Sequence, residues 1–283
     1  MVGLILEGGG MRGAFTAGVL DYWLEMGLHF HEVYGVSAGA CQGASYLCGQ
    51  KGRGIRVWLK YLQDPRFCSI RSLLTTGDLF GAEFSYDLLP RVLDPVDDGA
   101  YRASGSRLTC VVTDVTTGQP AYFPIRDMLE DLQLLRASSS MPLVSNIVPW
   151  QGRLYLDGGV ADSIPVRHSI ADGHDKNVLV LTQAPGYRKK PNRALPLMRV
   201  KYRQYPKLVE AVARRHIVYN DTLDFIEQQA AAGKVFVLRP DVTPEVGRVE
   251  KNPDKLRQLH AVGAAIARRE HARLLRFLGD EAY

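Results

Sequence analysis

The chain begins with a short apolar strand that runs directly into a cluster of glycines and then into a helix. Residues 2–6 are apolar, as expected for a buried strand, and four glycines lie between positions 8 and 13. From residue 12 to residue 26, aromatic and aliphatic side chains recur at helical spacing, and Gly27 is placed to end that helix. A buried strand that leads into a helix is typical of parallel sheets, which helices cover. The N-terminal unit therefore favours an α/β fold.

Strands and helices alternate along the rest of the chain. Strands are expected at 33–36, 108–115, 153–156, 177–182 and 234–238, and helices at 38–48, 128–138 and 206–232. The last helix is the clearest, with Asn252 as its cap and Pro253 at its first position. Its apolar side is expected to consist of Leu256, Leu259, Val262, Ile266, Leu274 and Leu275. This alternation predicts a mostly parallel sheet covered on both faces. Residues 185–196, rich in Pro, Lys and Arg, are predicted to form a linker or exposed loop.

Composition limits the class of protein. Of the 283 residues, 46% are hydrophobic and 23% are charged, which excludes a disordered, collagen-like or coiled-coil chain. No apolar run approaches the ~20 residues of a membrane-spanning helix, and the N-terminus lacks the basic region of a signal peptide. The four cysteines form no CxxC pair, which suits free thiols in a reducing compartment. We therefore expect a cytoplasmic protein with neither a signal peptide nor a transmembrane segment.

The glycine cluster at 8–13 has three interpretations. It satisfies G-x-G-x-x-G, the pattern of dinucleotide sites, but such a site needs an acidic residue at the end of the second strand, and residues 35–39 contain none. Alternatively, the loop presents bare N–H groups to a developing anion at a helix N-terminus. The third interpretation is a tight turn without a ligand. Arg12 either adds positive charge beside the loop or pairs with a structural acid.

A candidate nucleophile, Ser37, lies in the pattern G-x-S-x-G between a strand and a helix. Gly35 and Gly39 allow a sharp turn that lifts the serine out of the sheet, and the helix dipole then faces its oxygen. The alternative is a glycine-rich turn in which the serine only caps the helix. The strand–turn–helix context favours the nucleophile.

A candidate base, Asp157, ends the strand at 153–156 and precedes Gly158 and Gly159. Taken alone, this pattern is more often a plain turn. A Ser–Asp–His order is formally possible with His168 or His216. However, several strands precede the nucleophile in α/β-hydrolases, whereas a single strand precedes the strand–turn–helix unit of Ser37. That topology does not fit.

Taken together, the GGGxRG loop, the GxSxG turn and the DGG turn resemble the patatin-like phospholipase family, in particular its short bacterial members. The order and spacing match from residue 2 to about residue 184, and segments 75–81, 137–142 and 162–165 are similar too. One departure is Gly159, where many members have alanine; glycine is an accepted variant at this position.

The resemblance implies a three-layer α/β/α sandwich with a mostly parallel central sheet, followed by C-terminal helices. It implies a catalytic domain at 1–184 and, at 185–283, a basic loop and a mainly helical region packed on it. Ser37 would be the nucleophile and Asp157 the base of a Ser–Asp dyad. Gly8, Gly9, Gly10, Arg12 and Gly13 would form the oxyanion hole. The implied activity is hydrolysis of phospholipid or other acyl esters, of the phospholipase A or lysophospholipase type, through an acyl-serine and without metal or cofactor.

Two alternatives remain at this stage. The same dyad could serve a soluble carboxylesterase or thioesterase. From a different class, a non-catalytic anion- or nucleotide-binding protein could use the loop at 8–13 alone, although the intact Ser37 and Asp157 argue against it. Labelling by a fluorophosphonate separates these classes, because only an activated serine reacts.

A basic segment at 188–215 is the last feature of the sequence. It holds ten basic residues and one acid, Glu210, for a formal charge of +9, whereas the whole chain carries +5. The basic residues are Arg188, Lys189, Lys190, Arg193, Arg199, Lys201, Arg203, Lys207, Arg214 and Arg215, and the interleaved apolar or amphipathic residues are Tyr187, Leu195, Leu197, Met198, Val200, Tyr202 and Tyr205. This pattern predicts peripheral contact with an anionic membrane, at its inner surface. The alternative is a solvated basic face paired with acids; no motif supports nucleic-acid binding.

Overall fold

A computed structural model describes residues 2–279 and contains one eight-stranded sheet. Five strands run parallel in the order β3 (Arg107–Asp114), β2 (Glu32–Val36), β1 (Val2–Leu6), β7 (Lys176–Val180) and β8 (Val235–Leu238). Beyond β3, the strands β4 (Pro120–Ile125), β6 (Arg153–Asp157) and β5 (Val148–Trp150) add antiparallel pairs. The prediction of a mostly parallel sheet is confirmed, although the short strands β4 and β5 were not anticipated.

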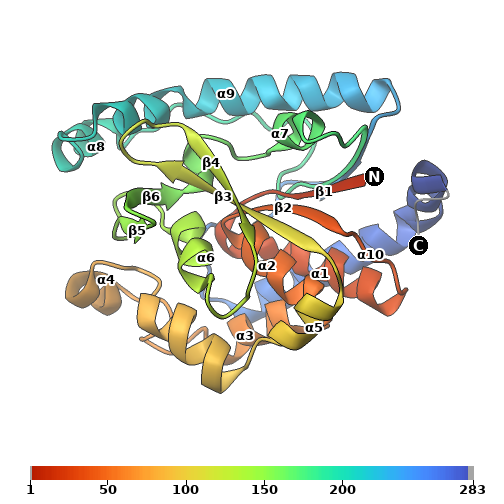
Figure 1. Cartoon of the computed structure of the whole chain (residues 1–283), viewed down its shortest axis with the longest axis horizontal. Helices are drawn as coiled ribbons and strands as arrows, with labels where there is room; N and C mark the ends of the chain where they lie inside the picture. The colour runs from red at the N-terminus through yellow and green to blue at the C-terminus, as the bar shows by residue number, and fades with distance from the viewer. Residues whose placement is uncertain (1, 280–283) are drawn as a thin grey trace.

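Helices cover both faces of the sheet, which makes the molecule a three-layer α/β/α sandwich (Figure 1). On one face lie α1 (Gly13–Glu25), α2 (Ala38–Leu47) and α10 (Pro253–Leu278); on the other lie α7 (Val166–Ala171) and the long α9 (Pro206–Ala231). Strand β1 divides its side chains accordingly, since Leu4 and Leu6 pack in the core of the α1 side and Ile5 packs with residues of α7 and α9. The fold class predicted from the sequence is confirmed.

The remaining helices are short. They are α3 (Arg53–Tyr61), α4 (Ile70–Thr76), the π-helical η2 (Phe84–Leu93), α5 (Asp98–Ala103), α6 (Leu132–Ser139) and α8 (Leu195–Lys201), with single turns at η1 (Gly10–Arg12) and η3 (Gly158–Val160). The helix expected at 128–138 begins at Leu132. Before it, the carboxylates of Asp127 and Asp131 accept backbone N–H groups, and such local bonds compete with helix formation.

The C-terminal helix packs directly on the first helix. Asn252 caps α10 as predicted, because its side-chain oxygen accepts N–H groups of Asp254 and Lys255. Val262 was expected on the buried side but is 38% exposed. Gly263 faces α1 instead, where a Cβ would collide with the carbonyl of Phe15, so the two helices approach too closely for a side chain.

The predicted loop at 185–196 is largely exposed and leads into α8. Within residues 2–279, every helix lacks the combination of length and apolar character needed to cross a membrane.

Candidate active site

Ser37 occupies a strained turn between β2 and α2. Its backbone has φ 55° and ψ −124°, a conformation that non-glycine residues rarely adopt and that is typical of a nucleophile elbow. A Cβ at Gly39 would collide with the carbonyl of Leu6, so the turn can pack on β1 only with glycine there. The N–H of Ser37 donates to Ser138 Oγ at 2.8 Å. These contacts fix the turn that carries the side chain of Ser37.

Asp157, 120 residues further along the chain, accepts a hydrogen bond from Ser37 Oγ through Oδ2 at 2.9 Å. Strand β3 brings the two together, because Val36 pairs with Val111 on one side of β3 and Asp157 pairs with Val112 on the other. The second oxygen, Oδ1, accepts the N–H of Gly159 at 2.7 Å. Both carboxylate oxygens are thus fixed in position.

The carboxyl group of Asp157 is almost fully buried, with 6% of the residue exposed. Burial raises its pKa, because the charged form is poorly solvated there. The positive charge of Arg215 and the hydrogen bonds from Ser37 and Gly159 oppose this by favouring the carboxylate. A raised pKa makes the carboxylate a stronger base than an ordinary aspartate.

The glycine loop at 8–10 borders the same site. Gly8, Gly9, Gly10 and Arg12 line a cavity together with Ser37 and Asp157. Gly10 has φ +58° and packs so closely on the backbone of Arg248 that a Cβ would not fit. Within residues 2–279, no hydrogen bond uses the N–H groups of Gly8, Gly9 or Gly10, whereas Met11 N–H donates to the carbonyl of Arg248 at 3.0 Å.

Gly13, also predicted for this loop, lines neither of the two cavities at Ser37. A Cβ there would lie 3.1 Å from that of Ala38 and 3.2 Å from the ring of Trp58. Its position is explained by the packing of α1 against α2 and α3.

The two histidines considered for a triad lie in other surroundings. The ring of His168 stacks on Tyr122 with 3.4 Å between centroids, and His168 Nε2 lies 3.5 Å from Asp172. The Nδ1 atom of His216 is buried without a partner in the described part of the chain. Among the hydrogen bonds of residues 2–279, none joins a histidine to Ser37 or Asp157. The same residues contain no cluster of His, Cys, Asp and Glu suited to a metal ion, and their four cysteines are free.

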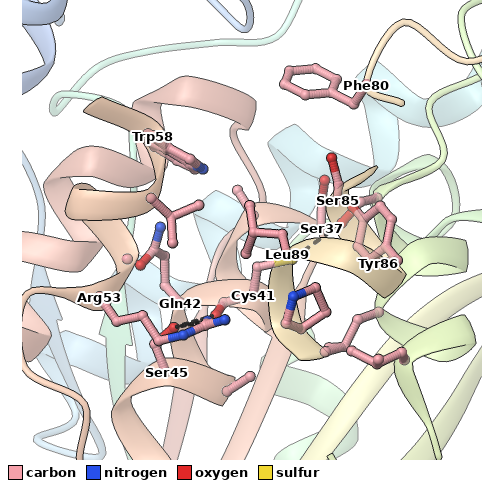
Figure 2. Close-up of a pocket in the computed structure, with 18 of the residues that line it drawn as sticks. Ser37, Cys41, Gln42, Ser45, Arg53, Trp58, Phe80, Ser85, Tyr86 and Leu89 are labelled. Carbon is pink, nitrogen blue, oxygen red and sulfur yellow. Dashed lines mark hydrogen bonds between the residues drawn. The ribbon is translucent and has the colours of Figure 1, made fainter. Parts of the chain in front are cut away.

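An apolar cavity of about 150 Å³ opens from one side of Ser37. Its walls come mainly from α2, α3, η2 and α6, with side chains such as Val57, Trp58, Leu89 and Leu135, and Phe80 adds to them from the segment before η2. Figure 2 shows Ser37 close to Ser85 and Tyr86 at one end, with Trp58 and Arg53 toward the other. This cavity could not be predicted from the sequence, because two of the helices that line it, α3 and η2, lie between residues 53 and 93, where no helix is predicted.

A second, polar cavity of about 340 Å³ meets the first at Ser37, Gly10 and Met141. It lies beyond the carboxyl ends of β1 and β7, where Glu7 and Gln183 line it. The chain connects β1 to β2 on one side of this point and β7 to β8 on the other, and such points are the usual ligand sites of open α/β sheets. Four cationic side chains line the cavity: Arg12, Lys189, Arg215 and Arg248.

The structure corrects part of the prediction that residues 188–215 contact a membrane. Lys189 and Arg215 point into the polar cavity rather than out to a membrane. Met198 and Tyr202 are 0% and 2% exposed, because they pack in a core cluster with residues of α9. Leu197 and Val200, by contrast, are 57% and 71% exposed on α8. The exposed part of the segment is therefore smaller than its charge of +9 suggested.

Comparison with known proteins gives two family matches. A model described as patatin-like phospholipase matches residues 4–170, more than half of the chain, and a model described as a domain of unknown function (DUF6363) matches residues 205–279. The first match includes Ser37 and Asp157; the second includes Arg215 and Arg248.

The individual proteins that resemble this chain have low sequence identity to it. The protein YjjU of Escherichia coli, named as uncharacterized, is 28% identical over 84% of this chain and 68% of its own length. Lysophospholipase nte1 of Aspergillus terreus is 26% identical over 62% of this chain, which spans 11% of that protein. A solved structure, VipD from Legionella pneumophila, aligns with a TM-score of 0.46 at 13% identity, over 94% of this chain and 66% of that chain.

Proposed function

Because the chain belongs to the patatin-like phospholipase family, we propose that it hydrolyses fatty-acyl ester bonds of lipids through a Ser37–Asp157 dyad. The observation that carries the proposal is the 2.9 Å hydrogen bond from Ser37 Oγ to Asp157 Oδ2. It lies where an apolar and a polar cavity meet. An ester with an apolar acyl chain and a polar alcohol part fits this arrangement.

In the proposed first step, Asp157 Oδ2 accepts the proton of Ser37 while Ser37 Oγ attacks the ester carbonyl. A serine hydroxyl needs such a base, because it is a weak nucleophile in its protonated form. The tetrahedral intermediate collapses when Asp157 returns the proton to the leaving alcohol, which leaves an acyl-serine. Asp157 then deprotonates a water molecule that attacks the acyl-serine. When this second intermediate collapses, Asp157 returns the proton to Ser37 Oγ and the fatty acid is released.

The negative oxygen of the intermediate is proposed to face the N–H groups of Gly9 and Gly10. These groups border the cavity with Ser37 and have no partner within residues 2–279. Donors of this kind contribute about 3 kcal/mol each to transition-state stabilisation in other hydrolases. Arg12 lines the same cavity and adds positive charge beside the loop.

The apolar cavity is proposed to receive the acyl chain and the polar cavity the alcohol part of the substrate. This assignment agrees with the name lysophospholipase carried by the Aspergillus relative. We also propose that the catalytic domain ends near residue 184. Residues 185–283 would form a region that packs on this domain, adds β8 and α10 to it and supplies part of the wall of the site.

Labelling with a fluorophosphonate tests the proposal. The probe is expected to modify the wild-type protein at Ser37, identified by peptide mapping, and to leave the Ser37→Ala variant unmodified. An Asp157→Asn variant should label far more slowly, whereas Asp175→Asn, a matched change at an exposed aspartate, should label at the wild-type rate. Labelling of wild-type protein at another serine, or none at all, would refute the dyad.

A further inference from the structure

The polar cavity holds more positive charge than its surroundings neutralise. Arg12 comes from η1, Lys189 from the loop before α8, Arg215 from α9 and Arg248 from the loop before α10. None of the four forms an ion pair with another residue of the described chain. The Nε atoms of Arg12 and Arg215 are buried and have no hydrogen-bond partner within residues 2–279.

Arg53, in the neighbouring apolar cavity, shows how this protein satisfies a buried arginine. Its Nη1 donates to Ser45 Oγ at 3.2 Å and its Nη2 to the carbonyl of Asp94 at 2.8 Å. Its Nε, like that of Arg215, has no hydrogen bond within residues 2–279, but it lies 3.3 Å from the Asp94 carboxylate in an ion pair. Arg215 has no such partners among residues 2–279. Buried polar groups are normally bonded, so donors left free around a cavity point to a ligand that completes them.

The two acids of the cavity are engaged elsewhere. Glu7 accepts hydrogen bonds from the N–H of Thr182 at 2.6 Å, from Thr182 Oγ1 at 3.1 Å and from Tyr219 OH at 2.7 Å. Asp157 is bonded to Ser37 and to the N–H of Gly159. Four cations therefore face two carboxylates, and neither carboxylate is hydrogen-bonded to any of them in the described chain.

Gly159 gives the guanidinium of Arg215 its place beside the dyad. A Cβ at this position would lie 3.1 Å from Arg215 Nη2 and 2.9 Å from Asp157 Oδ1. Glycine at the last position of the DGG turn thus leaves room for a cation next to the base.

We propose that Arg12, Lys189, Arg215 and Arg248 bind the phosphate of the substrate's headgroup, so that the enzyme selects lipids with an anionic phosphate on the alcohol side. This inference rests on the proposed function, because it places the headgroup next to the ester that Ser37 attacks. Guanidinium groups suit phosphate, since their planar donors match its oxygens. The C-terminal region, which carries Arg215 and Arg248, would then determine substrate choice.

Lys189 holds its proton less firmly than an ordinary lysine, so its charge depends on what the cavity contains. Its pKa is lowered well below the ordinary value, first by burial and then by the positive charge of Arg215, while its Nζ lies 3.7 Å from the ring centroid of Tyr219. A phosphate would favour the charged form of Lys189 and relieve the mutual repulsion of the cations.

Hydrolysis of two lysolipids with the same acyl chain tests the inference: a monoacylglycerol phosphate and the monoacylglycerol without phosphate, both below their critical micelle concentrations. Wild-type protein is expected to prefer the phosphate lipid in kcat/KM by about tenfold or more, as for a charge-assisted hydrogen bond. Arg215→Gln and the exposed rim variant Arg248→Gln should lose most of this ratio, mainly through KM for the phosphate lipid. Arg257→Gln, the same change on the outer face of α10, should keep it. Equal kcat/KM for the two lipids in wild-type protein would overturn the headgroup assignment.

Binding of inorganic phosphate separates this inference from the proposed activity. Phosphate is expected to raise the melting temperature of wild-type and Arg257→Gln protein but not of Arg215→Gln, and to inhibit hydrolysis competitively. If phosphate stabilises a protein that hydrolyses neither lipid, the anion site stands and the proposed function fails. If hydrolysis proceeds while phosphate changes neither melting temperature nor rate, the anion site is refuted and the dyad stands.

Discussion

The two cavities that meet at Ser37 are built from different parts of the chain. The apolar cavity is lined only by residues from Gly10 to Met141, whereas the polar cavity combines residues from Glu7 to Val249. The first therefore lies within the residues matched by the patatin-like model, and the second depends on the region matched by the DUF6363 model. Under the two proposals above, the chemistry and the acyl pocket belong to the region of the first match, whereas headgroup selection depends on the C-terminal region.

Removal of the dyad affects both cavities and should have the largest effect. We expect Ser37→Ala and Asp157→Asn each to lower kcat/KM by about 10²–10⁴-fold on phosphate and neutral lysolipids alike, because nucleophile and base are common to both. The fold should persist, since both side chains keep nearly the same volume. Steady-state kinetics and circular dichroism together check this.

The matching control concerns the histidines. His168→Ala and His216→Ala should keep most of the activity, since neither side chain is bonded to the dyad in the described chain. If either change proved as damaging as Ser37→Ala, a triad would be the better description.

The second-largest effect is expected from filling the apolar cavity alone. Val57 is 8% exposed and lines this cavity, so Val57→Phe should obstruct long acyl chains. We expect kcat/KM for long-chain esters to fall about tenfold or more and short-chain esters to be hydrolysed nearly as before, at a stability cost of about 1–3 kcal/mol. Val262→Phe, on the exposed side of α10, is the control.

Val57→Phe also tests whether the two cavities act independently. The preference for phosphate over neutral lipid should remain in Val57→Phe, because the cationic cavity is untouched. A joint loss of chain-length and headgroup preference would mean that the two cavities do not act separately.

The sequence predicted the sheet, the main helices and the Ser37–Asp157 pair because these depend on local patterns. Glycines around Ser37 and after Asp157 mark turns that can be recognised without the tertiary structure. The positions of Lys189 and Arg215 could not be predicted in this way. Nothing in their sequence surroundings distinguishes them from the neighbouring basic residues. In the structure, α9 carries Arg215 and, through Asn220, holds the backbone of Lys189, so that both residues line the cavity while Arg214 stays exposed.

The exposed basic residues permit a third, smaller test, of the proposed contact with membranes. On and next to α8, Arg199 and Arg203 are exposed and have no ion pair within residues 2–279, and Leu197 and Val200 are exposed beside them. A cation near an anionic leaflet contributes about 1 kcal/mol. Reversing both charges, Arg199→Glu with Arg203→Glu, should therefore weaken binding to anionic vesicles by about tenfold or more.

Vesicle co-sedimentation measures this effect. Arg257→Glu with Arg276→Glu changes the net charge equally on α10 and should bind as the wild type does. Binding should decrease with salt, since exposed charges are screened within about 10 Å at 0.1 M. Equal binding to neutral and anionic vesicles would remove the basic surface from the functional account, whereas hydrolysis of monomeric lipid would be unaffected.

The smallest effect at neutral pH is expected from the contact between the two regions, Arg215 beside Asp157. In the proposed mechanism, Asp157 must be a carboxylate to accept the proton of Ser37, so kcat/KM should rise with pH through its pKa. Burial raises that pKa; the charges of Arg215 and, more weakly, Arg248 lower it, as do the hydrogen bonds from Ser37 and Gly159.

Removing the charge of Arg215 takes away one of the effects that lower the pKa of Asp157, so that pKa must rise further. The acid limb of the kcat/KM profile on the neutral lysolipid should therefore move to higher pH in Arg215→Gln. It should stay in place in Arg215→Lys, which keeps the charge. At pH values well above the acid limb, kcat/KM for the neutral lysolipid should change little in either variant. An acid limb that moves to lower pH in Arg215→Gln, or that moves equally in Arg215→Lys, would show that the C-terminal region does not set the charge of the base.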